Sequence, residues 1–188
     1  MSNSLAKNLF IVTAPSGAGK TTLIKNILKF AETNDQKVFM SISHTTRTPR
    51  DGEKDGTDYL FLTESEFKSN VDQGVYVEHA LVHGNLYGTP KTAIDEHLEN
   101  GYKVLLEIDW QGASQVKQKL TDSKLIFIAP PNLETLEERL RLRNQDTEDV
   151  IRNRLQKAHD ELLTYKHYDY LIINDDFENA VGELCSII

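Results

Sequence analysis

The chain has 188 residues, of which 39% are hydrophobic and 27% charged, and its formal net charge is −8. This size suits one domain with a sizeable core, and the acidic balance argues against a general nucleic-acid-binding protein. No apolar run approaches the length of a membrane-spanning helix, and the run at 9–15 lacks a signal-peptide cleavage site. The single cysteine, Cys185, excludes an intrachain disulfide and favours a reducing, cytoplasmic location.

Strands and helices alternate along most of the sequence. In chain order, the apolar patterns predict a strand at 9–14, a helix at 21–30, strands at 38–43 and 59–62, a helix at 65–71, a strand at 75–82, a helix at 90–100, a strand at 104–109, a helix at 111–120, a strand at 125–130, helices at 133–143 and 147–165, a strand at 170–174 and a helix at 177–188. We therefore expect a three-layer α/β fold with a mostly parallel sheet. Residues 35–90 break the alternation with more strands, Gly and Pro, which predicts an inserted subdomain.

The segment APSGAGKT, residues 14–21, fits the phosphate-loop pattern G-x-x-x-x-G-K-[ST] except at its first position. It lies between a predicted strand and a predicted helix, where backbone N–H groups cradle phosphates. Lys20 is expected to reach the β- and γ-phosphates of a bound nucleotide, and the Thr21 hydroxyl to bind Mg²⁺. Ala14 replaces the first glycine and fits only with a negative φ. The predicted nucleotide-phosphate contacts here are Ala14, Pro15, Ser16, Gly17, Ala18, Gly19, Lys20, Thr21 and Thr22.

A second candidate anion site is SISHTTRTPRDGEKDGTDYLF, residues 41–61. Arg47 and Arg50 flank Pro49, which stiffens the loop between two forked, charge-assisted phosphate donors. Tyr59 adds a phenolic donor. The alternative to a phosphate site is a basic loop whose arginines are simply solvated.

This segment resembles the signature of the guanylate kinase family, and VEHALVHGNLYGTP (77–90), LEIDWQG (106–112) and IINDD (172–176) follow in the family's order. The resemblance covers about residues 8–186. It implies ATP-dependent phosphorylation of GMP to GDP, with ATP and GMP as ligands and Mg²⁺ as cofactor. It also implies a P-loop domain over 7–186, divided into a core (7–34, 91–136 and 157–186), a GMP-binding subdomain (about 35–90) and a helical lid (about 137–156).

By matching positions, the resemblance assigns the GMP phosphate to Arg47, Arg50, Tyr59 and Tyr87, and the guanine to Ser43, Glu78 and Thr89, with Asp109 nearby. Chemistry supports the role of Glu78. A carboxylate accepts from both N1–H and N2–H₂ of guanine, whereas adenine presents an acceptor at N1, and a site built around such bonds rejects analogues that lack them. An exposed strand carboxylate is the plain alternative.

Glu107 and Asp109 end a predicted buried strand on one face. We expect Glu107, where the family usually has Asp, to orient the acceptor arginines within the GMP site. Asp109 is expected beside the guanine, or in the Mg²⁺ shell through water. Asn174 and Asp175, after the last predicted strand, are expected near the adenine of ATP.

The resemblance marks Arg139, Arg143 and Arg154 as lid arginines that act with Lys20 and Arg47 in catalysis. Transferring phosphoryl groups spread negative charge over their equatorial oxygens, which such cations stabilise. A helix surface with i,i+4 ion pairs is the plain alternative. Asn144 stands where the family usually has Gly.

Three other functions are weaker. His79 and His83 lack a third zinc ligand, and DWQG at 109–112 fits a GTPase motif without the N-K-x-D motif that reads the base. A catalytically inactive interaction module of the same fold typically loses the phosphate loop, which is intact here. The sequence does not decide between a monomer and a homo-oligomer, and we expect neither a nucleic-acid nor a membrane partner.

Overall fold

A computed structural model describes residues 4–82, 84–142 and 147–188. A five-stranded parallel sheet in the order β2-β7-β1-β8-β9 forms its centre. Its strands are β1 (Leu9–Thr13), β2 (Val38–Met40), β7 (Lys103–Glu107), β8 (Lys124–Ala129) and β9 (Tyr170–Ile173). All five residues of β1 are buried, which explains its unbroken apolar sequence.

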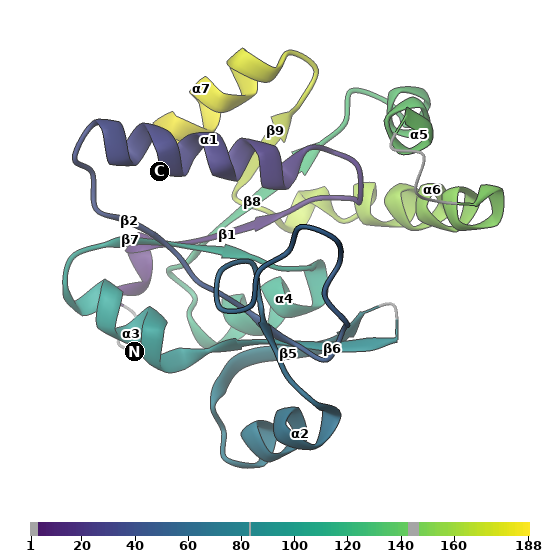
Figure 1. Ribbon diagram of the computed structural model, residues 1–188. Coiled ribbons are helices and arrows are strands. Elements are labelled where there is room, and N and C mark those ends of the chain that lie inside the picture. The colour runs from purple at the N-terminus through teal and green to yellow at the C-terminus, as the bar shows by residue number, and fades with distance from the viewer. Residues whose placement is uncertain (1–3, 83, 143–146) are drawn as a thin grey trace.

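Helices cover both faces of this sheet and make three layers (Figure 1). Alternate side chains of β1 enter two separate cores: Ile11 packs with residues of α3 and α4, whereas Phe10 and Val12 pack with residues of α1 and α7. These helices are α1 (Lys20–Thr33), α3 (Lys91–Glu99), α4 (Trp110–Lys119) and α7 (Phe177–Ile187). The predicted α/β class and parallel sheet are confirmed.

A second sheet of four strands, in the order β4-β3-β6-β5, lies next to the first, with α2 (Glu64–Asp72) beyond it (Figure 1). Its strands are β3 (His44–Thr45), β4 (Leu60–Phe61), β5 (Tyr76–Val82) and β6 (Asn85–Pro90). The sequence analysis missed β6. The strand predicted at 38–43 is wrong in its extent: β2 ends at Met40 and pairs with β7 in the central sheet, and the second sheet begins at His44.

Helices α5 (Leu133–Leu142) and α6 (Glu148–Leu162) lie together at one side of the molecule (Figure 1). Leu136, Leu140, Ile151 and Ala158 form their own small hydrophobic cluster. Short 3₁₀ turns, Ala6–Asn8 and Tyr165–His167, precede β1 and follow α6. His83, Arg143 and Asn144 lie outside the described residues. In the part of the chain that the structure describes, no helix is long and apolar enough to cross a membrane.

Candidate active site

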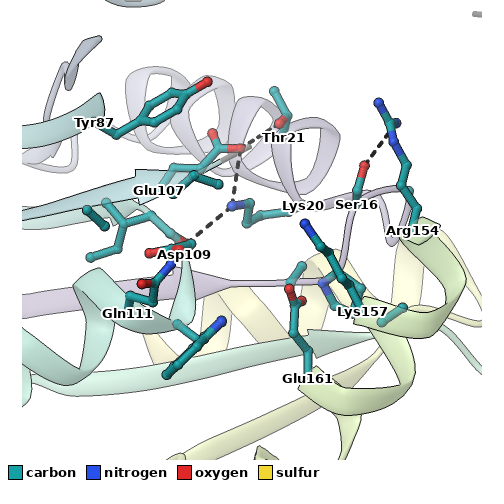
Figure 2. A pocket seen from close by; sticks show the side chains of 18 of the residues that line it. Ser16, Lys20, Thr21, Tyr87, Glu107, Asp109, Gln111, Arg154, Lys157 and Glu161 are labelled. Atoms are coloured by element: carbon teal, nitrogen blue, oxygen red, sulfur yellow. Dashed lines mark hydrogen bonds and ion pairs between the residues drawn. The ribbon is translucent and has the colours of Figure 1, made fainter. Parts of the chain in front are cut away.

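A cavity of about 720 Å³ opens where the loop after β1 meets the second sheet, the end of β7 and helix α6. This volume is typical of small-molecule sites. Figure 2 shows the side chains that point into it from these elements. The predicted site residues that line it are Ala14, Pro15, Ser16, Gly17, Gly19, Lys20, Thr21, Thr22, Ser43, Arg50, Tyr59, Glu78, Tyr87, Glu107, Asp109 and Arg154. Other predicted residues lie behind this lining or away from it: Ala18, Arg47, Thr89, Arg139, Asn174 and Asp175.

The loop between β1 and α1 has the backbone that phosphate binding requires. Gly17 and Gly19 have φ of +99° and +93°, a region that side chains disfavour. Among the described residues, Asp35 is the only residue other than glycine with a positive φ. Ala14 therefore has the negative φ that alanine requires at the first position of the loop. Asn174 Nδ2 donates to the carbonyl of Ala18 at 2.7 Å and holds the loop from β9. The contact of Asn174 with adenine stays a prediction.

Glu107 lies against the phosphate loop. Its Oε1 accepts a hydrogen bond from Thr21 Oγ1 at 2.5 Å and is 3.8 Å from Lys20 Nζ, which also donates to the carbonyl of Ile108 at 3.4 Å (Figure 2). The expectation that Glu107 orients the acceptor arginines is therefore wrong for this structure, in which a different carboxylate, Glu53, holds Arg47. The end of β7 runs beside β1, so Glu107 faces the loop that follows β1.

Glu53 was missed, although it stands within the arginine segment. Arg47 Nη2 donates to its two oxygens at 2.8 and 3.0 Å, and the backbone N–H of Arg50 donates to Oε2 at 2.8 Å. Burial acts to raise the pKa of Glu53, but the hydrogen bonds from Arg47 and from the backbone of Arg50, together with the charges of both arginines, outweigh it, and the pKa lies below its usual value. Arg47 Nε also donates to the Tyr87 hydroxyl at 3.2 Å. Burial, together with the charge of Glu107, raises the pKa of Tyr59 to about 12, which keeps its hydroxyl a donor.

Glu78 is buried, with 3% of its surface exposed, so the alternative of an exposed strand carboxylate is wrong. Thr89 Oγ1 donates to Glu78 Oε1 at 2.5 Å and lies 3.2 Å from Ser43 Oγ, which joins β5, β6 and the segment before β3 in one polar cluster. Burial raises the pKa of Glu78 to about 7, the hydrogen bond from Thr89 opposes the rise, and the charge of Asp109 adds to it.

Asp109 is the N-cap of α4. Its Oδ1 accepts from the backbone N–H of Gly112 at 2.9 Å, and its Oδ2 accepts from Gln111 Nε2 at 3.0 Å. These bonds hold the carboxylate in place at the wall of the cavity (Figure 2). Glu107 and Asp109 both line this cavity, although β7 ends at Glu107 and Asp109 already belongs to the start of α4.

Helix α6 supplies the remaining wall, with Arg154, Lys157 and Glu161 (Figure 2). Arg154 Nη1 donates to Ser16 Oγ at 3.2 Å, which connects α6 to the phosphate loop. The sequence analysis missed Lys157 and Glu161. Burial raises the pKa of Glu161 to about 7, and the charge of Lys20 opposes that rise. From α5, Arg139 Nη2 donates to the carbonyl of Asn174 at 2.9 Å.

A family model described as guanylate kinase matches residues 6–188. The chain belongs to the guanylate kinase family. It is 49% identical to a guanylate kinase of Legionella pneumophila (strain Paris) over 181 residues, which is 96% of this chain and 85% of the relative. It is likewise 49% identical to a guanylate kinase of Escherichia coli (strain K12) over 96% of this chain and 86% of that relative.

A solved structure agrees with these sequence matches. The crystal structure of guanylate kinase from Anaplasma phagocytophilum superposes with a TM-score of 0.78 at 33% identity, over 95% of this chain and 82% of the other. The phosphate loop and the second sheet therefore belong to a kinase fold, and the GTPase alternative loses its support. Among the described residues, which do not include His83, no group of three His, Cys, Asp or Glu is placed for a metal ion.

Proposed function

We propose that the chain catalyses ATP + GMP = ADP + GDP, with ATP on the phosphate loop and GMP between Arg50, Tyr59 and Glu78. The observation that carries this proposal is the sharing of one cavity: the phosphate loop lines it together with Arg50 and Tyr59, from the segment between β3 and β4, and Glu78 of β5. Such an arrangement places an acceptor phosphate next to a donor phosphate, and this proximity lowers the barrier. We also propose a cytoplasmic location, which the single cysteine favours, and small molecules as the partners.

Lys20 and the loop amides are proposed to bind the donor phosphates, and the loop lies at the N-terminus of α1, where anions are favoured. Arg154 is already hydrogen-bonded to Ser16 of the loop, so its guanidinium lies close to the expected position of the transferring group. Arg139 and Arg143 are proposed to complete this cationic cover over the developing negative charge. No general base is required, because the acceptor is itself a phosphate oxygen.

The acceptor phosphate is proposed to bind Arg47, Arg50, Tyr59 and Tyr87. Arg47 is held by hydrogen bonds to Glu53 and Tyr87, which orient its guanidinium. Guanine is proposed to donate from N1–H and N2–H₂ to Glu78, with Thr89 and Ser43 beside it. Adenine offers an acceptor where guanine offers a donor, which disfavours AMP.

The residues around Thr21 fit Mg²⁺, because they present hard oxygen donors: the Thr21 hydroxyl and the carboxylates of Glu107 and Asp109. Thr21 is proposed to bind the ion directly, and Glu107 and Asp109 to hold its water molecules. Bound Mg²⁺ would neutralise phosphate charge and orient the donor phosphates.

The proposal is tested by an assay of ADP production with ATP and Mg²⁺ and, in separate reactions, GMP, AMP, CMP or UMP. We expect turnover with GMP alone, at roughly 1–100 s⁻¹, and its loss in Lys20→Ala without loss of folding. Turnover with another nucleotide would overturn the base assignment. Folded protein that binds GMP but turns over none of the four would instead be an interaction module of the same fold.

A further inference from the structure

Polar side chains of α4 form hydrogen bonds with backbone N–H and C=O groups along the unpaired edge of β5. This strand ends the second sheet, since β6 pairs with only one of its sides. Gln115 Oε1 accepts from the backbone N–H of His79 at 3.3 Å, and its Nε2 donates to the carbonyl of the same residue at 2.8 Å. Lys119 Nζ donates to the carbonyl of Val77 at 2.5 Å. The amide of Gln115 thus bonds to β5 as a neighbouring strand would.

Glu78 is the residue between these two anchored positions. Its backbone is therefore fixed on both sides by side chains of α4, while its carboxylate points to the cavity. Gly112 lies on the same face of α4, three residues before Gln115. A Cβ at Gly112 would meet the Glu78 carboxylate, so the helix approaches the carboxylate as closely as glycine permits.

The position of the Glu78 carboxylate must be more precise than that of an ordinary strand side chain, because the proposed contact with guanine depends on it. Two parallel hydrogen bonds to one edge of a base tolerate little displacement, and misplacement of about 1 Å in such a site has been linked to losses of about 100-fold. An edge strand has no second strand to hold its register. The paired bonds from Gln115 supply that restraint at the residue directly after Glu78.

We propose that Gln115 is a positioning residue for base selection: its side-chain amide holds β5 so that Glu78 meets the guanine edge. The inference rests on the proposed role of Glu78. Gln115 itself does not line the cavity, so it acts through the strand and not by touching the nucleotide.

The test compares Gln115→Met, which keeps the length of the side chain and removes both hydrogen bonds, with Gln118→Met as the matched control. Gln118 lies on the same helix, is exposed and bonds only to Ser114 among the described contacts. We expect Gln115→Met to raise KM for GMP about tenfold, to leave KM for ATP unchanged, and to lower the preference for GMP over inosine monophosphate, which lacks the 2-amino group. Gln118→Met should change none of these.

If Gln115 only stabilised the fold, Gln115→Met would give a different result. The substitution would lower the melting temperature and the active fraction while KM and the preference for GMP stayed at wild-type values, and this result would overturn the proposal. A double-mutant cycle with Glu78→Gln separates the effect of Gln115 on base preference from the effect of Glu78. If Gln115 acts through Glu78, the Gln115→Met change has no further effect on base preference in the Glu78→Gln background.

The cycle also distinguishes the two possible failures. Unchanged base preference in Glu78→Gln alone would refute the proposed role of Glu78. A changed preference in Glu78→Gln, combined with a wild-type preference in Gln115→Met, would refute only the positioning role of Gln115.

Discussion

At the scale of single residues, the burial of Glu78 raises the pKa of its carboxyl, and the protonation state of this carboxyl is expected to control the affinity for GMP. Its pKa of about 7 means that the carboxyl loses its proton only near neutral pH, because burial and the nearby charge of Asp109 disfavour the anion, while Thr89 and Lys119 favour it. Guanine offers two donors, which require the anion as acceptor. On the proposed role of Glu78, we therefore expect binding of GMP to lower this pKa and to release a proton at or below neutral pH.

The sign of the pH dependence follows from this coupling. Affinity for GMP should be constant above pH about 7 and fall by up to about tenfold for each pH unit below it, which KM for GMP measured from about pH 5 to about pH 8 would show. The phosphate of GMP titrates near pH 6 as well. Glu78→Gln is the control, since it retains the phosphate titration and loses that of the carboxyl. Equal pH slopes in the two proteins would contradict the prediction.

At the scale of elements, the turn from β1 into α1 depends on Gly19 for two separate reasons. Its φ of +93° is unfavourable for any side chain, and a Cβ there would meet the amide group of Asn174 that holds the loop. We expect Gly19→Ala to destabilise the protein by about 1–3 kcal/mol or more, which corresponds to roughly 2–4 °C of melting temperature for each kcal/mol. Calorimetry of the unliganded protein measures this loss.

Gly74 provides the matched control for Gly19. It also has positive φ, +66°, but a Cβ there would meet nothing within 4 Å. Gly74→Ala therefore has the backbone cost alone. Equal losses in the two variants would show that the contact with Asn174 does not matter, and that Asn174 adapts to the added methyl group.

Local sequence patterns predicted the parts of this site that depend on adjacent residues. The phosphate loop and the arginine segment are continuous motifs, so Lys20 and Arg47 could be identified without knowledge of the packing. Lys157 and Glu161 could not, because their helix is charged on several sides and only its packing against the loop shows which side faces the cavity. Gln115 was missed for the same reason.

The predicted fold was limited in the same way. Strands buried on both faces have continuous apolar sequences and were found, as β1 and β8 show. Strand β6 includes glycine and proline and has weak alternation, and its pairing with β3 and β5 makes it a strand. The segment 38–43 is apolar enough for one strand, but the chain passes between two sheets within it, which no local pattern records.

At the scale of the whole molecule, three parts meet at one cavity: the central sheet with its two cores, the second sheet, whose Val77 packs into one of these cores, and helix α6, which shares a small cluster of its own with α5. A cluster of four buried residues stabilises its helices less than the main cores stabilise theirs, so α5 and α6 are expected to open most readily. Ligands that touch several parts would couple their stabilities.

Hydrogen exchange can measure this coupling. We expect GMP alone to slow amide exchange in β5 and β6, and GMP with a non-hydrolysable ATP analogue to slow it in α6 as well, because Arg154 connects α6 to the phosphate loop at Ser16. Arg154→Ala should keep the protection of β5 and β6 and lose that of α6. If both ligands together left exchange in α6 unchanged in the wild-type protein, the helix would be no part of the closed site, and the proposed catalytic role of Arg154 would fail with it.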